Sequence, residues 1–144
     1  MDKLTYELVA SDRDLKAAFD VRRQVFVDEQ CIPEDLVFDG RDQEALHIVV
    51  KDGECVVGTA RVLFLSDSRA KLERMAVTRA SRRKGIGRGI ISFLNEELRN
   101  KQVEQLVLHA QLGVVEFYKS CGFEESGLPF WEAGIKHIKM QRSL

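Results

Sequence analysis

The chain has 144 residues and a formal net charge of -1, with 44% apolar and 31% charged residues. This length fits one domain with a hydrophobic core, so we expect a single domain over residues 1–144. The small net charge argues against nucleic acid or a membrane surface as the partner, and no apolar run reaches membrane-spanning length. Three widely spaced cysteines favour reduced thiols and a cytoplasmic location.

The N-terminal half predicts a strand, a helix and a hairpin. KLTYELV (3–9) alternates like a strand, and Asp12 can cap a helix that continues to about residue 30. An acidic loop follows. ALHIVVK (45–51) and CVVGTARVLFL (55–65), joined by DGE, predict a β-hairpin whose second strand is apolar on both faces and therefore central in a sheet.

The C-terminal half alternates strands and helices. KLERMAV (71–77) predicts a strand, and a helix with an apolar stripe follows a glycine-bearing loop near residue 85. EQLVLHA (104–110) predicts a strand, LGVVEFYKSC (112–121) a helix ended by Gly122, and strands follow at 122–127 and 134–140. The predicted fold is an α/β domain with a mixed, largely antiparallel twisted sheet flanked by about four helices.

The loop RASRRKGIGRGI (79–90) carries five basic residues and three glycines just before a helix. It matches neither a Walker loop nor a Rossmann fingerprint, which require other spacings. Unpaired backbone amides at a helix start, close to basic side chains, nevertheless suit a phosphate group. A solvated loop is the alternative interpretation.

Two segments carry a family resemblance. LERMAVTRASRRKGIGRGI resembles the signature of the GNAT superfamily of acyl-CoA-dependent N-acyltransferases, with Arg82, Gly85 and Gly87 at its signature positions. VLHAQLGVVEFYKSCGF resembles the second block of that family, with Tyr118 in its expected place and Gln111 where many members have Asn. RRQVFVDEQ and ALHIVV resemble small bacterial members of the YjcF and ElaA type.

The resemblance implies direct transfer of an acetyl group from acetyl-CoA to a primary amine. Val77 would hold the pantetheine arm, and the Met75 N–H would stabilise the thioester oxyanion. Their strand must splay from EQLVLHA to admit acetyl-CoA. The other implied contacts to CoA are Arg82, Arg83, Lys84, Gly85, Gly87, Arg88 and Gln111.

Two residues are implied in catalysis. Tyr118 would be the general acid that protonates the leaving thiolate, with a core aromatic as the alternative. Strand alternation would place Glu73 on the face of Met75 and Val77 as the general base, with a surface carboxylate paired to an arginine as the alternative. His47 or water could also serve as the base. We expect no metal, because the remaining histidines have no partners at metal-ligand spacing.

The resemblance implies a small or cationic amine as the acceptor, because it places the acidic segment from Asp28 to Glu44 on the acceptor side of the cleft, where negative charge attracts a cation. Three other functions remain open: acyl-CoA binding without turnover, nucleic-acid binding through the basic loop, and acyl-homoserine-lactone synthesis, which RRQVF loosely resembles. Homodimers are common in the GNAT fold, so a homodimer is open too. The sequence does not specify the acceptor or the acyl chain length.

Overall fold

The computed structural model describes residues 3–144, and within this range seven strands form one sheet in the order β1-β2-β3-β4-β5-β7-β6. Only β4 and β5 pair in parallel; the other neighbours are antiparallel. The mixed, largely antiparallel sheet expected from the sequence is therefore confirmed. The strands are β1 (Leu4–Leu8), β2 (Leu46–Asp52), β3 (Cys55–Phe64), β4 (Arg69–Val77), β5 (Gln105–Gln111), β6 (Glu124–Glu132) and β7 (Ile135–Ser143).

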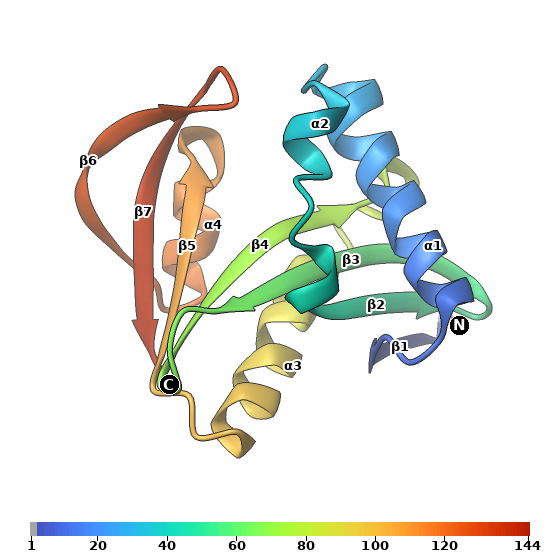
Figure 1. The fold of residues 1–144 in the computed structure, drawn as a ribbon, viewed down its shortest axis with the longest axis horizontal. Helices are drawn as coiled ribbons and strands as arrows, with labels where there is room; N and C mark the ends of the chain where they lie inside the picture. The colour runs from blue at the N-terminus through green and yellow to red at the C-terminus, as the bar shows by residue number, and fades with distance from the viewer. Residues whose placement is uncertain (1–2) are drawn as a thin grey trace.

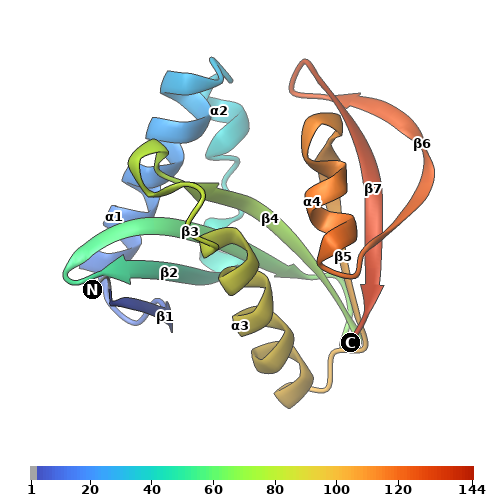
Figure 2. The same cartoon turned by 180° about the vertical axis from the view of Figure 1, so that it is seen from behind.

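Helices cover both faces of the sheet. Figures 1 and 2 show α1 and α2 on one face and α3 and α4 on the other. Ser11 rather than Asp12 caps the first helix, because its side chain accepts a hydrogen bond from the Asp14 N–H at 3.2 Å. None of the helices within residues 3–144 is long and apolar enough to cross a membrane. The helical segments are α1 (Asp12–Arg22), the π-helical η1 (Arg23–Glu29), α2 (Glu34–Val37), η2 (Asp42–Glu44), η3 (Arg79–Ser81), α3 (Ile86–Asn100), η4 (Leu112–Val114) and α4 (Val115–Ser120).

The main core lies between the sheet and α3. Ile90, Leu94 and Leu98 of that helix are fully buried against strand residues such as Val62 and Leu106. A smaller apolar cluster on the opposite face joins α1 and η1 to the sheet. β3 is buried on both faces from residue 57 to 63, as its apolar sequence predicts.

The two parallel strands part halfway along their length. β4 and β5 are paired only where Arg69–Leu72 lie opposite Gln105–Leu108. Beyond that point β4 stays beside β3 and β5 stays beside β7, so the sheet opens (Figure 1). The expected splay of these strands is confirmed.

A β-bulge interrupts β4 where the sheet opens. Arg61 lies opposite Glu73 and Thr59 opposite Ala76, so three steps on β4 match two on β3. Within this segment Arg74 has a φ of 54°, a left-handed conformation that is uncommon for a residue other than glycine. The extra residue reverses the alternation of every side chain that follows it.

This bulge corrects one sequence-based prediction. Glu73 contacts Arg61, and Ala76 packs with the cluster beneath α1. Met75 and Val77 pack instead against the core on the α3 side. Glu73 therefore does not share a face with Met75 and Val77, because simple alternation fails across a bulge.

Candidate functional site

A cleft of about 690 Å³ opens where β4 and β5 part. One wall comes from η1 and α2, the other from β5, α4 and the turn between β6 and β7. Arg83, Lys84, Gly85 and Arg88 lie in the adjoining loop and helix start but do not line the cleft. The predicted site residues that do line it are Glu73, Met75, Val77, Arg82, Gly87, Gln111 and Tyr118.

The first turn of α3 borders the cleft at Gly87 and presents backbone N–H groups there. Gly85 precedes the helix with a φ of +78°, and the Gly89 N–H donates to the Gly85 carbonyl at 2.9 Å. The amides of Ile86, Gly87 and Arg88 precede this first helical hydrogen bond and have no partner one turn earlier. Such amides, at the positive end of a 15-residue helix, favour an anion.

Two arginines of the loop are oriented by neighbouring groups. Arg82 donates to the Val77 carbonyl at 3.0 Å and to Glu29 at 2.9 Å. Arg88 donates to the Ser120 hydroxyl at 2.8 Å. Both guanidinium groups therefore lie close to the helix start. The Arg82 guanidinium is already paired with the carboxylate of Glu29 in η1.

Gly87 brings the strand edge, the helix start and α4 together. A Cβ atom at Gly87 would lie 3.7 Å from Met75 Cε and 3.2 Å from Phe117 Cζ. Next to it, the β4 edge that faces β5 has no strand partner from Glu73 to Val77 within the described chain. This free edge can hydrogen-bond an extended polar chain.

Tyr118 of α4 lines the cleft and also packs with two aromatic rings. Its ring centroid lies 5.1 Å from that of Phe117 and 5.9 Å from that of Phe123, both edge-on. The Tyr118 hydroxyl donates no hydrogen bond to any residue in the range 3–144. Burial raises the pKa of Tyr118 above its usual value, so the phenol stays protonated at neutral pH.

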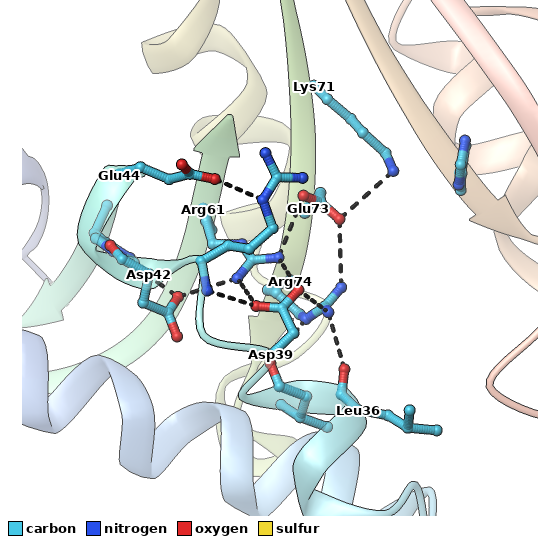
Figure 3. A network of polar contacts seen from close by, with 12 residues as sticks. Leu36, Asp39, Asp42, Glu44, Arg61, Lys71, Glu73 and Arg74 are labelled. Carbon is cyan, nitrogen blue, oxygen red and sulfur yellow. Dashed lines mark hydrogen bonds and ion pairs between the residues drawn. The ribbon is translucent and has the colours of Figure 1, made fainter. Parts of the chain in front are cut away.

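A buried ion network lies behind the bulge (Figure 3). Arg61 is fully buried and donates to both oxygens of Asp39 at 2.8 and 3.0 Å, to Asp42 at 3.2 Å and to Glu73 at 3.3 Å. Arg74 donates to Asp39 at 3.2 Å and to the Val37 carbonyl at 3.1 Å. The hydrogen bonds from Arg61 hold the pKa of Asp39 well below its usual range. The network thus links the bulged segment of β4 to Asp39 and Asp42 of the acidic segment.

The two base candidates from the sequence differ in their positions. Glu73 lines the cleft, but its Oε1 faces Arg61 while its Oε2 lies 3.6 Å from Lys71 and 3.5 Å from Arg74. His47 does not line the cleft. It is buried in the network, where its Nε2 donates to the Asp42 carbonyl at 2.8 Å, and burial lowers its pKa.

The acidic segment is largely neutralised by arginines of the same chain. Asp42 lies 2.8 Å from the fully buried Arg22. Three more acids of the segment are paired: Glu29 with Arg82, Glu34 with Arg23 and Glu44 with Arg41. These pairings reduce the free negative charge on which the expectation of a cationic acceptor depends.

A polar cluster that the sequence did not predict lies on the wall opposite Glu73. His109 Nδ1 lies 3.0 Å from Glu132 Oε1, and His137 Nε2 lies 3.8 Å from Glu132 Oε2. All three residues line the cleft. Hydrogen bonding to His109 lowers the pKa of Glu132. No group of three or more metal-binding side chains is found among residues 3–144.

Comparison with known proteins gives consistent matches over nearly the whole chain. A family model described as the acetyltransferase (GNAT) domain matches residues 5–144. The uncharacterized N-acetyltransferase YjcF of Bacillus subtilis (strain 168) is 37% identical over 136 residues, which cover 94% of this chain and 96% of that protein. The crystal structure of Escherichia coli ElaA has a TM-score of 0.85 and 28% identity, covering 99% of each chain.

A third similarity concerns the fold alone. A GNAT family acetyltransferase from Elizabethkingia anophelis, solved with acetyl-CoA bound, has a TM-score of 0.78 at 16% identity and covers 100% of both chains.

Proposed function

This chain belongs to the GNAT acetyltransferase family, and we propose on that basis that it transfers an acetyl group from acetyl-CoA to a small primary amine. One observation carries the proposal. The cleft between β4 and β5 joins an unpaired strand edge to the bare amides of α3, and Tyr118 lines the same space.

In this proposal the CoA pyrophosphate binds at the start of α3. The amides from residue 86 to 88 would receive its oxygens, with Gly85 and Gly87 leaving the backbone accessible. The Arg82 guanidinium would leave the Glu29 carboxylate and bind a phosphate oxygen instead, since both groups are anions that accept its hydrogen bonds. Arg83, Lys84 and Arg88 would add positive charge around the pyrophosphate. The acetyl-CoA bound to the Elizabethkingia anophelis protein supports this choice of ligand.

The pantetheine arm would run along the free edge of β4. Val77 would contact the arm, and the Met75 N–H would polarise the thioester carbonyl and stabilise its oxyanion. Gln111 would border the arm on the β5 side, where its amide now donates to the Gln30 side chain at 3.0 Å. The amine enters from the end of the cleft where Glu73 lies.

The chemistry is a direct displacement at the thioester carbon. The amine nitrogen forms the new C–N bond and gives up one N–H proton to a base, and the C–S bond breaks. The sulfur takes a proton from the Tyr118 hydroxyl, which then regains one from solvent. The sequence predicted that Glu73 acts as the base. Because both of its oxygens face cations, we propose instead that Glu73 accepts a hydrogen bond from the amine and orients it.

The test is a turnover screen with acetyl-CoA against a library of small primary amines. Free CoA thiol is detected and the acetylated amine is identified by mass spectrometry. We expect at least one amine to release thiol and form its acetamide in equal amounts. Binding of acetyl-CoA with no thiol release beyond background hydrolysis would contradict transfer and favour a non-catalytic acyl-CoA-binding protein.

We also propose a cytoplasmic location, in keeping with the free thiols of Cys31, Cys55 and Cys121.

A further inference from the structure

The pairing of His109 with Glu132 fixes the hydrogen-bonding state of the imidazole. A carboxylate only accepts hydrogen bonds, so the 3.0 Å contact requires that His109 Nδ1 carries the proton. Nε2 of the neutral ring is then a proton acceptor, and it forms no hydrogen bond with any other part of the described chain. The ring is further held by Phe130, edge-on with a centroid distance of 4.9 Å.

His109 lies immediately beyond the point where the strands part. Leu72 and Leu108 form the last pair between β4 and β5, so Glu73 and His109 are the next residue on each strand. Leu108 and Ala110 pack into the core on the α3 side, which directs His109 to the other face, where Glu73 lies. A ligand inserted between the strands would therefore have Glu73 on one side and His109 on the other.

The charged groups around His109 come from four elements. β4 contributes Lys71 and Glu73, and the acidic loop contributes Asp39. β6 contributes Glu132, and β7 contributes His137, which lines the cleft. Lys139 of β7 lies directly opposite His109 in the sheet register. Glu132 is thus the carboxylate that contacts the ring, and it can stabilise an imidazolium if His109 gains a proton.

We propose that His109, oriented by Glu132, accepts the proton of the attacking amine. This inference rests on the proposed acetyl transfer. As the amine nitrogen bonds to the thioester carbon, its N–H proton passes to His109 Nε2, and the C–S electron pair leaves with sulfur, which Tyr118 protonates. His109 then releases its proton to water and Tyr118 regains one, so the net products are the acetamide and CoA thiol. His109 is the catalytic base, and Glu132 is a positioning residue.

The first test reads the imidazole directly, without any substrate. The chain has three histidines, so their ring nitrogens can be assigned by ¹⁵N NMR. We expect neutral His109 to carry its proton on Nδ1 in the wild type and in Glu124→Ala, a matched change at an exposed position of the same strand. Glu132→Ala should release Nδ1 and return the ring to the Nε2–H form. A wild-type His109 in the Nε2–H form would overturn the proposal.

The second test is kinetic, with an amine identified in the turnover screen. His109→Gln keeps a polar side chain of similar size but cannot take the proton. We expect kcat/KM for the amine to fall about 10²–10⁴-fold and the acidic limb of its pH profile to disappear. CoA affinity measured by calorimetry should be unchanged. Glu132→Ala should lower kcat/KM for the amine without changing the KM for acetyl-CoA, and Glu124→Ala should behave as wild type.

These outcomes separate the two proposals. Wild-type turnover with an unchanged pH profile in His109→Gln would overturn the role of His109 and leave acetyl transfer intact. Absence of turnover with every amine would contradict acetyl transfer, and the base role would fall with it. Circular dichroism checks folding; should His109→Gln fail to fold, the NMR result and the Glu132→Ala kinetics decide.

Discussion

Leu72 of β4 lies opposite Leu108 of β5, and no pair beyond them joins these strands in the described structure. Each strand continues beside its other neighbour, so one edge of each is left without a backbone partner. An extended polar ligand can restore these hydrogen bonds, as a peptide does when it adds to a sheet edge. The position of the proposed acetyl-CoA site thus follows from where strand pairing stops.

Gly87→Asp should abolish CoA binding measured by calorimetry. The new carboxylate would occupy the space over the α3 amides and repel the pyrophosphate. The fold should persist, because an acidic residue in the first turn suits the helix dipole and Phe117 can shift by a few tenths of an ångström. The control is Gly53→Asp, in a turn where a Cβ meets nothing within 4 Å; its φ of +64° is strained for a side chain, but Asp is among the residues that adopt this conformation most readily. Wild-type affinity in a folded Gly87→Asp variant would contradict the proposed pyrophosphate site.

Tyr118→Phe should lower kcat about 10²–10⁴-fold with little change in the KM for acetyl-CoA, because a general acid acts only in the transition state. The ring contacts with Phe117 and Phe123 are retained, so stability should change little. Tyr6→Phe is the matched control, since it removes the only other tyrosine hydroxyl of the chain and Tyr6 does not line the cleft. A steady-state assay showing wild-type kcat in Tyr118→Phe would return Tyr118 to a packing role.

Asp42→Asn should destabilise the fold by about 3–5 kcal/mol, the usual cost of leaving a buried charge without its partner. Arg22 is fully buried and Asp42 is its nearest carboxylate, at 2.8 Å. Glu44→Gln, which breaks the exposed pair with Arg41, should cost only about 0–1 kcal/mol. Urea denaturation measures both variants. Equal losses of unfolding free energy in the two variants would mean that burial does not strengthen the Arg22–Asp42 pair.

Acid should destabilise the protein partly through Asp39. Arg61 lowers the folded-state pKa of Asp39 below the unfolded value of about 3.9. The unfolded chain therefore binds the proton first, so this stability is present above about pH 4 and is lost progressively below it. Urea denaturation from pH 7 to pH 3 should show Asp39→Asn less stable at pH 7 and with a shallower acid slope. An acid slope in Asp39→Asn equal to that of the wild type would contradict this prediction. The pKa of Glu132 is also lowered, so Glu132 contributes to acid destabilisation in the wild type and in the variant alike.

Much of the fold could be predicted because it rests on local patterns. The apolar stripe of α3 and the doubly apolar β3 follow directly from residue spacing, and both are buried as expected. The glycine-rich loop was recognisable because bare amides at a helix start have a sequence signature. The buried network has one sequence signal, the single arginine within the apolar run of β3: Arg61 is fully buried and pairs with three carboxylates.

The details of the site could not be predicted for physical reasons. Nothing in KLERMAV marks Arg74 as the bulge residue, yet that single insertion reverses the face of Met75 relative to Glu73. His109 and Glu132 are 23 residues apart, and they meet only because β7 pairs with β5 and carries the β6–β7 turn to the cleft. Such contacts depend on register and turn position, which periodicity does not specify.

The most direct test of the central claim is a ¹H–¹⁵N NMR titration of the protein with CoA. Amide shifts should change most at Met75, Val77 and residues 82–88, which lie along the proposed pantetheine and pyrophosphate sites. Shift changes confined to β1 and β2, at the edge of the sheet away from β5, or no changes at millimolar CoA, would contradict the claim that acetyl-CoA binds where β4 and β5 part.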